Sequence, residues 1–166
     1  MRRQHRVLAP LLVLALASAC GGGGSNPAAD AGVLLESDVE LQSFHLVNQA
    51  RSGEAVEPQL GLDPAVCEVA RRHSEAMRDE GFFSHTAADG QGLRQRLNRA
   101  GIAYSAAAEN LAEVHHATRP AEVAHSQLMS SASHRKNILS PKYKLAGVGV
   151  AKAGDTYWIT QVFIKP

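Results

Sequence analysis

The chain has 166 residues, with 17 Lys and Arg against 16 Asp and Glu, so its formal net charge is +1 at pH 7. Aromatic residues make up only 5% of the sequence, and the basic residues form no long run. Nucleic-acid-binding surfaces combine clustered cations with stacking rings, so this composition disfavours nucleic-acid binding.

Residues 1–19 have the pattern of a secretory signal peptide. Three arginines form a basic head, and the apolar run that follows is too short to span a bilayer comfortably. The run ends in LASAC at 16–20, which resembles a bacterial lipobox with Cys20 as the lipidated first mature residue, although alanine stands where leucine is usual. The alternative is an ordinary signal peptide that is cleaved near Ala19.

Residues 20–35 are expected to form a flexible, glycine-rich tether between an anchor and a folded domain. This organisation predicts an exported protein that is held at a bacterial membrane by a lipid, at the outer membrane in a Gram-negative host, or that is extracellular. If Cys20 is lipidated, Cys67 has no disulfide partner. The domain at 36–166 must then be stabilised by its own core, and its length suits a single domain. The sequence leaves the oligomeric state open.

Four segments have the pattern of helices, at 36–51, 63–81, 91–100 and about 120–129. We expect their N-termini to be capped by Ser37 or Asp38 in the first, Asp63 in the second and Thr118 in the last. Four further residues are expected on buried sides or as core anchors, and these are Leu41, Leu62, Cys67 and Val123.

The last part of the chain predicts a β-hairpin, with strands at 145–151 and 156–164 around a glycine-bearing turn. Gly147 and Gly149 would allow a helix or another backbone to pack closely on the first strand. Trp158 and Phe163 point to opposite faces of an unbulged strand, and we expect both to be buried. Helices followed by a hairpin indicate an α+β fold, in which helices cover a small antiparallel sheet.

Three short stretches carry polar side chains beside apolar anchors, at 82–85, 108–112 and 131–139. The third contains a histidine and two cations, and because Pro141 follows it we expect an ordered loop rather than a helix. We expect the three stretches to meet in one cleft. His73 is interpreted as a structural histidine, and the pair His115-His116 is expected to be exposed to solvent.

Read together, these segments resemble the CAP superfamily (SCP/TAPS; cysteine-rich secretory, antigen 5 and pathogenesis-related 1 proteins) in its bacterial form. The resemblance covers roughly Glu36 to Phe163 and implies a three-layer α-β-α sandwich. The matching motifs follow in the family's order, and they are 46–51, 63–77, 83–85, 108–112, 133–139, 147–150 and 157–163.

The resemblance implies a central cleft with two histidines and two acidic residues. His85, Glu109 and His134 match three of these positions. The second acidic position falls near Ser131, which has no carboxylate, and Glu122 lies on the same predicted helix more than two turns earlier. Ser131 and Glu122 are therefore the weaker candidates for the cleft.

Two imidazoles and a carboxylate suit zinc or another borderline divalent metal, with His85 and His134 as ligands and open positions for water or substrate. The first hypothesis is a tethered binding module whose cleft takes such a metal, a small apolar ligand or a component of the cell envelope. The second is a metal-dependent hydrolase or peptidase of the envelope. The third is a structural envelope protein in which the histidines only join loops. The chain has no Gly-x-Ser-x-Gly elbow, so a binding module is favoured over an enzyme.

Overall fold

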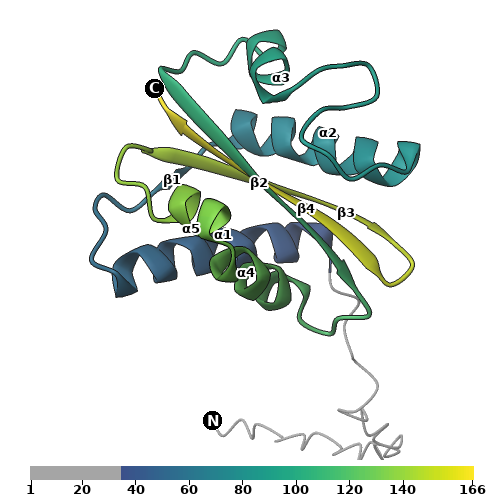
Figure 1. Cartoon of the computed structure of the whole chain (residues 1–166), viewed down its shortest axis with the longest axis horizontal. Helices are drawn as coiled ribbons and strands as arrows, with labels where there is room; N and C mark the ends of the chain where they lie inside the picture. Colours follow the sequence, from purple (N-terminus) through teal and green to yellow (C-terminus); the bar gives the residue numbers. More distant parts are fainter. Residues whose placement is uncertain (1–34) are drawn as a thin grey trace, which may run out of the picture. The chain divides into compact units, whose positions relative to one another are not determined.

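The computed structural model describes residues 35–166, so the predicted signal peptide, Cys20 and nearly all of the predicted tether lie outside the described residues. One mixed sheet lies between two layers of helices (Figure 1). The helices are α1 (Glu36–Gly53), α2 (Pro64–Glu80), α3 (Leu93–Arg99), α4 (Pro120–Ser130) and α5 (Ala132–Ile138), and the strands are β1 (Gly61–Leu62), β2 (Ala106–His115), β3 (Leu145–Ala153) and β4 (Thr156–Lys165).

The two faces of the sheet carry separate hydrophobic cores. On one face, the core joins α1, α4 and α5 to the strands and includes Phe163, which stacks on Tyr143. On the other face, residues of α2 and α3 such as Val66 and Leu97 pack with Val162 and Ile164 of β4. This arrangement confirms the predicted α+β fold with three layers.

The strands are ordered β1-β3-β4-β2. The predicted hairpin is confirmed as β3 and β4, and β2 runs antiparallel to β4. The expectation of a purely antiparallel sheet is wrong, because the two-residue strand β1 pairs in parallel with β3. The sequence also did not predict β2, whose alanines have little β propensity. Its ten residues are held by pairing with β4 rather than by local preference.

The close approach predicted at Gly147 and Gly149 is confirmed against α2. A Cβ atom added to Gly147 would lie 2.3 Å from the backbone nitrogen of Cys67, and one added to Gly149 would lie 2.0 Å from that of Arg71. These distances leave no space for a side chain, so β3 and α2 touch backbone to backbone.

Asp63 caps α2 as predicted, because its carboxylate accepts hydrogen bonds from the backbone nitrogens of Ala65 and Val66. The other two cap predictions are wrong. Helix α1 follows Leu35 without a side-chain cap, and α4 follows Arg119 rather than Thr118, also without one.

The stretch 131–139 was expected to be a loop, and this expectation is wrong for most of it. Residues Ala132–Ile138 form α5, preceded by Ser131 in extended conformation. Pro141 lies beyond the last helical residue, so it limits the length of this helix without preventing it.

Several expected core positions are more exposed than the helical and strand patterns indicated. Leu41, Leu62 and Val123 are exposed, and Cys67 is a half-buried free thiol. Trp158 is half-buried rather than buried, although Phe163 is fully buried as predicted. The spacing of apolar residues predicts which side of a helix or strand faces the core. It does not predict how much of that side the neighbouring layer covers.

Within residues 35–166, no helix combines the length and the hydrophobicity that crossing a membrane would require.

Candidate functional site

The site lies across the edge strand β2, where neighbouring residues point to opposite faces of the sheet. Glu109 points to the face covered by α2 and α3, and it contacts His85 in the loop between these helices. Asn110 points to the other face, where its side-chain nitrogen lies 3.2 Å from the backbone oxygen of His134 in α5. The three stretches are therefore brought together around β2, two of them reaching it from opposite layers.

The carboxylate of Glu109 is buried and has a partner on each oxygen. One oxygen lies 2.9 Å from Nδ1 of His85, and the other accepts a hydrogen bond from Nη2 of Arg96 at 2.5 Å. A buried carboxylate is stable as an ion only when it is paired and hydrogen-bonded, and this geometry meets both conditions. Arg96, Glu109 and His85 thus form a continuous chain of polar contacts.

Arg96 also holds the backbone of the loop that carries His85. Its Nη1 atom donates to the backbone oxygens of His85 at 3.2 Å and Gln91 at 3.3 Å. One guanidinium therefore fixes both the backbone of His85 and the carboxylate that contacts its ring. The sequence did not indicate Arg96, because it is one of three arginines on α3 and no local pattern distinguishes it from the other two.

The contact with Glu109 determines which nitrogen of His85 is available. A carboxylate accepts a hydrogen bond, so Nδ1 of His85 carries the proton in this contact and, in the neutral ring, Nε2 keeps its lone pair. The side chain of His85 is 58% exposed, so this nitrogen can be reached from solvent. A histidine that donates one ring nitrogen to a carboxylate while the other stays free has the arrangement of a metal ligand.

His134 lies in the first turn of α5 and is half-buried. Burial lowers its pKa, and the nearby charge of His85 lowers the pKa further. The imidazole of His134 is therefore in its neutral form, with a lone pair, at physiological pH.

Two asparagines connect α5 to the edge strand. Nδ2 of Asn137 lies 2.9 Å from Oδ1 of Asn110 and 3.5 Å from the backbone oxygen of Glu109. Asn110 is fully buried and also contacts Gln161 on β4. Arg135 of the same helix pairs with Glu54 at the surface. The asparagines satisfy buried polar groups, and they fix the helix that carries His134.

The structure gives the two weaker site candidates other partners. Glu122 accepts hydrogen bonds from Gln42 of α1 at 2.8 Å and from Arg119 at 2.7 Å. Ser131 immediately precedes α5, and its hydroxyl lies 3.1 Å from that of Ser133. Neither residue adds a carboxylate beside His85 and His134.

Within residues 35–166, no three or more His, Cys, Asp and Glu side chains form a group that could hold a metal ion. The candidate metal ligands that remain are the two imidazoles, because Glu109 uses both oxygens in contacts with protein. No hydroxyl of a described serine is hydrogen-bonded to His85 or His134, since Ser84 accepts from the backbone of Thr86 and Ser131 contacts Ser133. The arrangement resembles a binding site with open positions more than a serine-histidine catalytic pair.

His73 lies behind the site and is buried, which agrees with its interpretation as a structural histidine. Its Nε2 atom lies 2.9 Å from the backbone oxygen of Ser84, next to His85 in the chain. Burial lowers the pKa of His73. The exposed residues His115 and His116 lie at the far end of β2, as expected.

The sequence of residues 44–163 matches the model of the CAP family, the cysteine-rich secretory protein family. The match covers most of the chain, and the chain therefore belongs to this family. This chain is 33% identical to the protein YkwD of Bacillus subtilis (strain 168) over 125 residues, which are 75% of this chain and 46% of YkwD. The membrane protein YlbC of the same strain is 33% identical over 131 residues, 79% of this chain and 36% of YlbC.

A solved structure has the same fold. An extracellular protein from Bacillus anthracis that contains an SCP domain superposes with a TM-score of 0.67 and 32% sequence identity. The alignment covers 79% of this chain and 41% of that structure. The chain thus spans less than half the length of each of these three relatives.

Proposed function

We propose that this CAP protein is a binding module whose site across β2 takes a divalent metal such as zinc, with His85 and His134 as its ligands. The observation that carries the proposal is the chain from Arg96 through Glu109 to His85. This chain orients one imidazole so that its free nitrogen faces solvent, and α5 supplies the second imidazole.

The two imidazoles are suitable ligands for such a metal ion. Neutral imidazoles prefer zinc and other borderline divalent ions, and carboxylates that orient a ligating histidine are typical of such sites. Glu109 is assigned to this orienting role because Arg96 already binds its second oxygen. A bound metal would act as a Lewis acid toward a ligand in its open positions. With only two protein ligands, we expect a weaker site than a closed structural zinc centre.

The same contacts favour binding over hydrolysis. A metal-dependent hydrolase needs a free carboxylate or imidazole to take a proton from the attacking water. Among residues 35–166, the one carboxylate that contacts His85 is that of Glu109, which is bound by both Arg96 and His85. The alternative acid, Glu122, is bound elsewhere. The second candidate function, a metal-dependent hydrolase of the cell envelope, would require a base from the substrate or from a rearranged Glu109. The third is a scaffold that binds nothing.

For the location of the protein, we propose export followed by lipid anchoring at Cys20, with the ligand being a component of the envelope or a small apolar molecule at the membrane surface. The names of two relatives agree with this, since one is described as extracellular and the other as a membrane protein. Fractionation of cells that express the wild type and Cys20→Ala tests the anchor. Equal solubility of the two proteins would rule out the lipid anchor.

The experiment for the metal site is calorimetric titration of the full-length chain with zinc chloride at neutral pH. We expect saturable binding in the wild type, severe loss in His85→Ala and His134→Ala, and no change in His45→Ala, an exposed histidine on α1 that serves as the matched control. If the wild type shows no zinc binding and His134→Ala lowers the melting temperature, the site is a scaffold. Turnover of an envelope peptide that depends on metal and on His85 would favour the hydrolase.

A further inference from the structure

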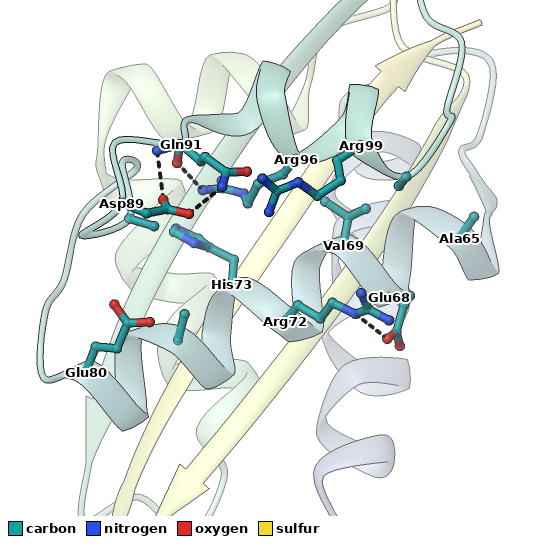
Figure 2. Close-up of a pocket in the computed structure, with 13 residues that line it drawn as sticks. Ala65, Glu68, Val69, Arg72, His73, Glu80, Asp89, Gln91, Arg96 and Arg99 are labelled. Carbon is teal, nitrogen blue, oxygen red and sulfur yellow. Dashed lines mark hydrogen bonds and ion pairs between the residues drawn. The ribbon is translucent and has the colours of Figure 1, made fainter.

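A pocket of about 480 Å³ lies between α2, α3 and the turn at Asp89–Gln91, and Arg96 is one of the residues that line it (Figure 2). This volume falls in the range of about 300–1,000 Å³ that is usual for small-molecule sites. Its wall is partly apolar, formed by Val69 and by four alanines, which are Ala65, Ala76, Ala87 and Ala100. These small side chains, on α2, in the loop that follows it and just after α3, leave this space open.

Two buried polar atoms of pocket residues have no hydrogen-bond partner among residues 35–166. One of them needs a hydrogen-bond donor and the other needs an acceptor. Nε2 of His73 lies against the carbonyl oxygen of Ser84, which can only accept, so Nε2 carries the proton. Nδ1 of His73 is then an acceptor without a donor. Nε of Arg96 is a donor without an acceptor. A buried polar group that is left unpaired destabilises the protein.

A ligand that satisfies both atoms must donate one hydrogen bond and accept another. An amide group does both, because its N–H can donate to His73 and its carbonyl can accept from Arg96. The ring of His73 extends from α2 toward the Asp89–Gln91 turn, with Arg96 on the opposite wall (Figure 2). The central part of the pocket is therefore suited to an amide.

The rim of the pocket has opposite charges at its two ends (Figure 2). Glu80 and Asp89 lie at one end, and Arg72 and Arg99 lie at the other. Arg72 pairs with Glu68, but no hydrogen bond or ion pair joins Arg99 or Glu80 to another residue that lines the pocket. One end is thus suited to a cation and the other to an anion.

We propose that this pocket binds short zwitterionic peptides, with the ammonium group near Glu80 and Asp89, the amide between His73 and Arg96, and the carboxylate at Arg99. The apolar wall formed by Val69 and the alanines accommodates a side chain of the peptide. The site is separate from the metal site and uses a different class of ligand.

The test uses the dipeptide alanyl-leucine and the full-length chain in a calorimetric titration. Three analogues each remove one feature: N-acetyl-alanyl-leucine lacks the ammonium, alanyl-leucinamide lacks the carboxylate, and the depsipeptide has an ester in place of the amide N–H. We expect saturable binding of alanyl-leucine and weaker binding of all three. Absence of alanyl-leucine binding, or binding of the three analogues with the same affinity as alanyl-leucine, overturns the proposal.

Protein variants locate the binding. Arg99→Gln and Glu80→Gln change exposed side chains and should each weaken alanyl-leucine binding about threefold to fivefold, as expected for a partly exposed ion pair. The matched control is Arg94→Gln, on the same helix but outside the pocket. In His73→Phe, the ring offers no acceptor in place of Nδ1, so discrimination against the depsipeptide should disappear.

The zinc titration of the same variants separates this proposal from the proposed metal site. Arg99→Gln should bind zinc like the wild type, and His134→Ala should bind alanyl-leucine like the wild type. If Arg99→Gln and Arg94→Gln bind alanyl-leucine with the same affinity, or if His134→Ala abolishes dipeptide binding, the pocket between α2 and α3 is not the site.

Discussion

Nη1 of Arg51, on α1, donates a hydrogen bond of 2.9 Å to the backbone oxygen of Ile138, the last residue of α5. The same atom donates to the backbone oxygen of Ser140, and Nη2 donates to that of Pro58. Arg51 is fully buried, and burial lowers its pKa. It satisfies carbonyl groups at the C-terminal end of the helix that carries His134.

Replacement of Arg51 should therefore destabilise the domain strongly. We expect Arg51→Met to lower the free energy of unfolding by about 3–5 kcal/mol, because one buried and two partly buried carbonyls lose their donor. Urea unfolding followed by circular dichroism measures the change. The control Arg135→Met removes only a surface ion pair with Glu54 and should change stability by about 0.5 kcal/mol or less. Equal effects of the two substitutions would contradict the anchoring role of Arg51.

The backbone contact between β3 and α2 predicts a severe effect of one added methyl group. Gly149→Ala would place a Cβ 2.0 Å from a backbone nitrogen of α2, so the layers must separate, at a cost of about 3 kcal/mol or more. Thermal unfolding checks this. Gly53→Ala is the matched control, because nothing lies within 4 Å of its added Cβ and its φ is not positive. A Gly149→Ala protein with an unchanged melting temperature would show that this contact is not tight.

Arg96 is expected to set the strength of zinc binding through Glu109. In Arg96→Gln, the carboxylate loses a charged partner and orients His85 less well, so zinc affinity should fall about tenfold. Calorimetric titration measures this, with Arg94→Gln as the control. An increase in affinity would mean that the released carboxylate becomes a ligand, and it would overturn the assignment of Glu109 as an orienting residue.

Zinc binding should weaken as the pH falls, because a proton and the metal compete for the same imidazole lone pair. An ordinary histidine has a pKa of about 6.5, so affinity should decline as the pH drops through this region. The pKa of His134 is lowered by burial and by His85, so this ring remains able to bind at lower pH than an ordinary histidine. Zinc titrations at pH 7.5 and 5.5 test whether the affinity falls at the lower pH. Equal affinity at the two pH values would exclude histidine ligands.

The buried His73 predicts a second effect of pH, on stability. Its pKa is lowered in the folded protein by burial, so the unfolded chain binds a proton more readily. Its contribution to stability is complete above the pKa of histidine in the unfolded chain, about 6.5. This contribution is lost as the pH falls toward the lower pKa of His73 in the folded protein, by at most about 1.4 kcal/mol per pH unit.

The measurement is urea unfolding of the wild type and His73→Gln at pH 7.5 and 5.5. Other groups also titrate in this range, among them His125 and His134, whose pKa values are lowered too, so the comparison of the two proteins isolates His73. The wild type should lose more stability than His73→Gln between the two values. Identical losses would mean that His73 takes up its proton equally well in the folded protein.

The sequence predicted the elements whose local pattern agrees with their final environment. Asp63-Pro64 starts α2 because a cap and a favourable first residue coincide, and the hairpin of β3 and β4 follows from apolar strands around a glycine-bearing turn. By contrast, β2 consists largely of alanine and polar residues, and it is a strand because β4 pairs with all ten of its residues. A long-range partner of this kind leaves no local signal.

For the candidate site, the sequence named His85, Glu109 and His134 through their motifs but not how they are connected. Glu109 and Asn110 are neighbours in the chain and reach opposite layers, because alternate residues of a strand face opposite sides of the sheet. The partner of Glu109 could not be predicted either. Arg96 is one of several arginines near α3, and only the packing of α3 beside β2 distinguishes it.

The position of Arg96 couples the two proposed binding sites, because its guanidinium lines the peptide pocket and also binds Glu109. Two binding equilibria that involve the same side chain are thermodynamically linked. If a bound peptide changes the affinity for zinc by some factor through its contact with Arg96, then bound zinc must change the affinity for that peptide by the same factor. Zinc titrations with and without saturating alanyl-leucine would give the size of this coupling. Its sign would show whether the two ligands compete for the guanidinium or stabilise one position of it.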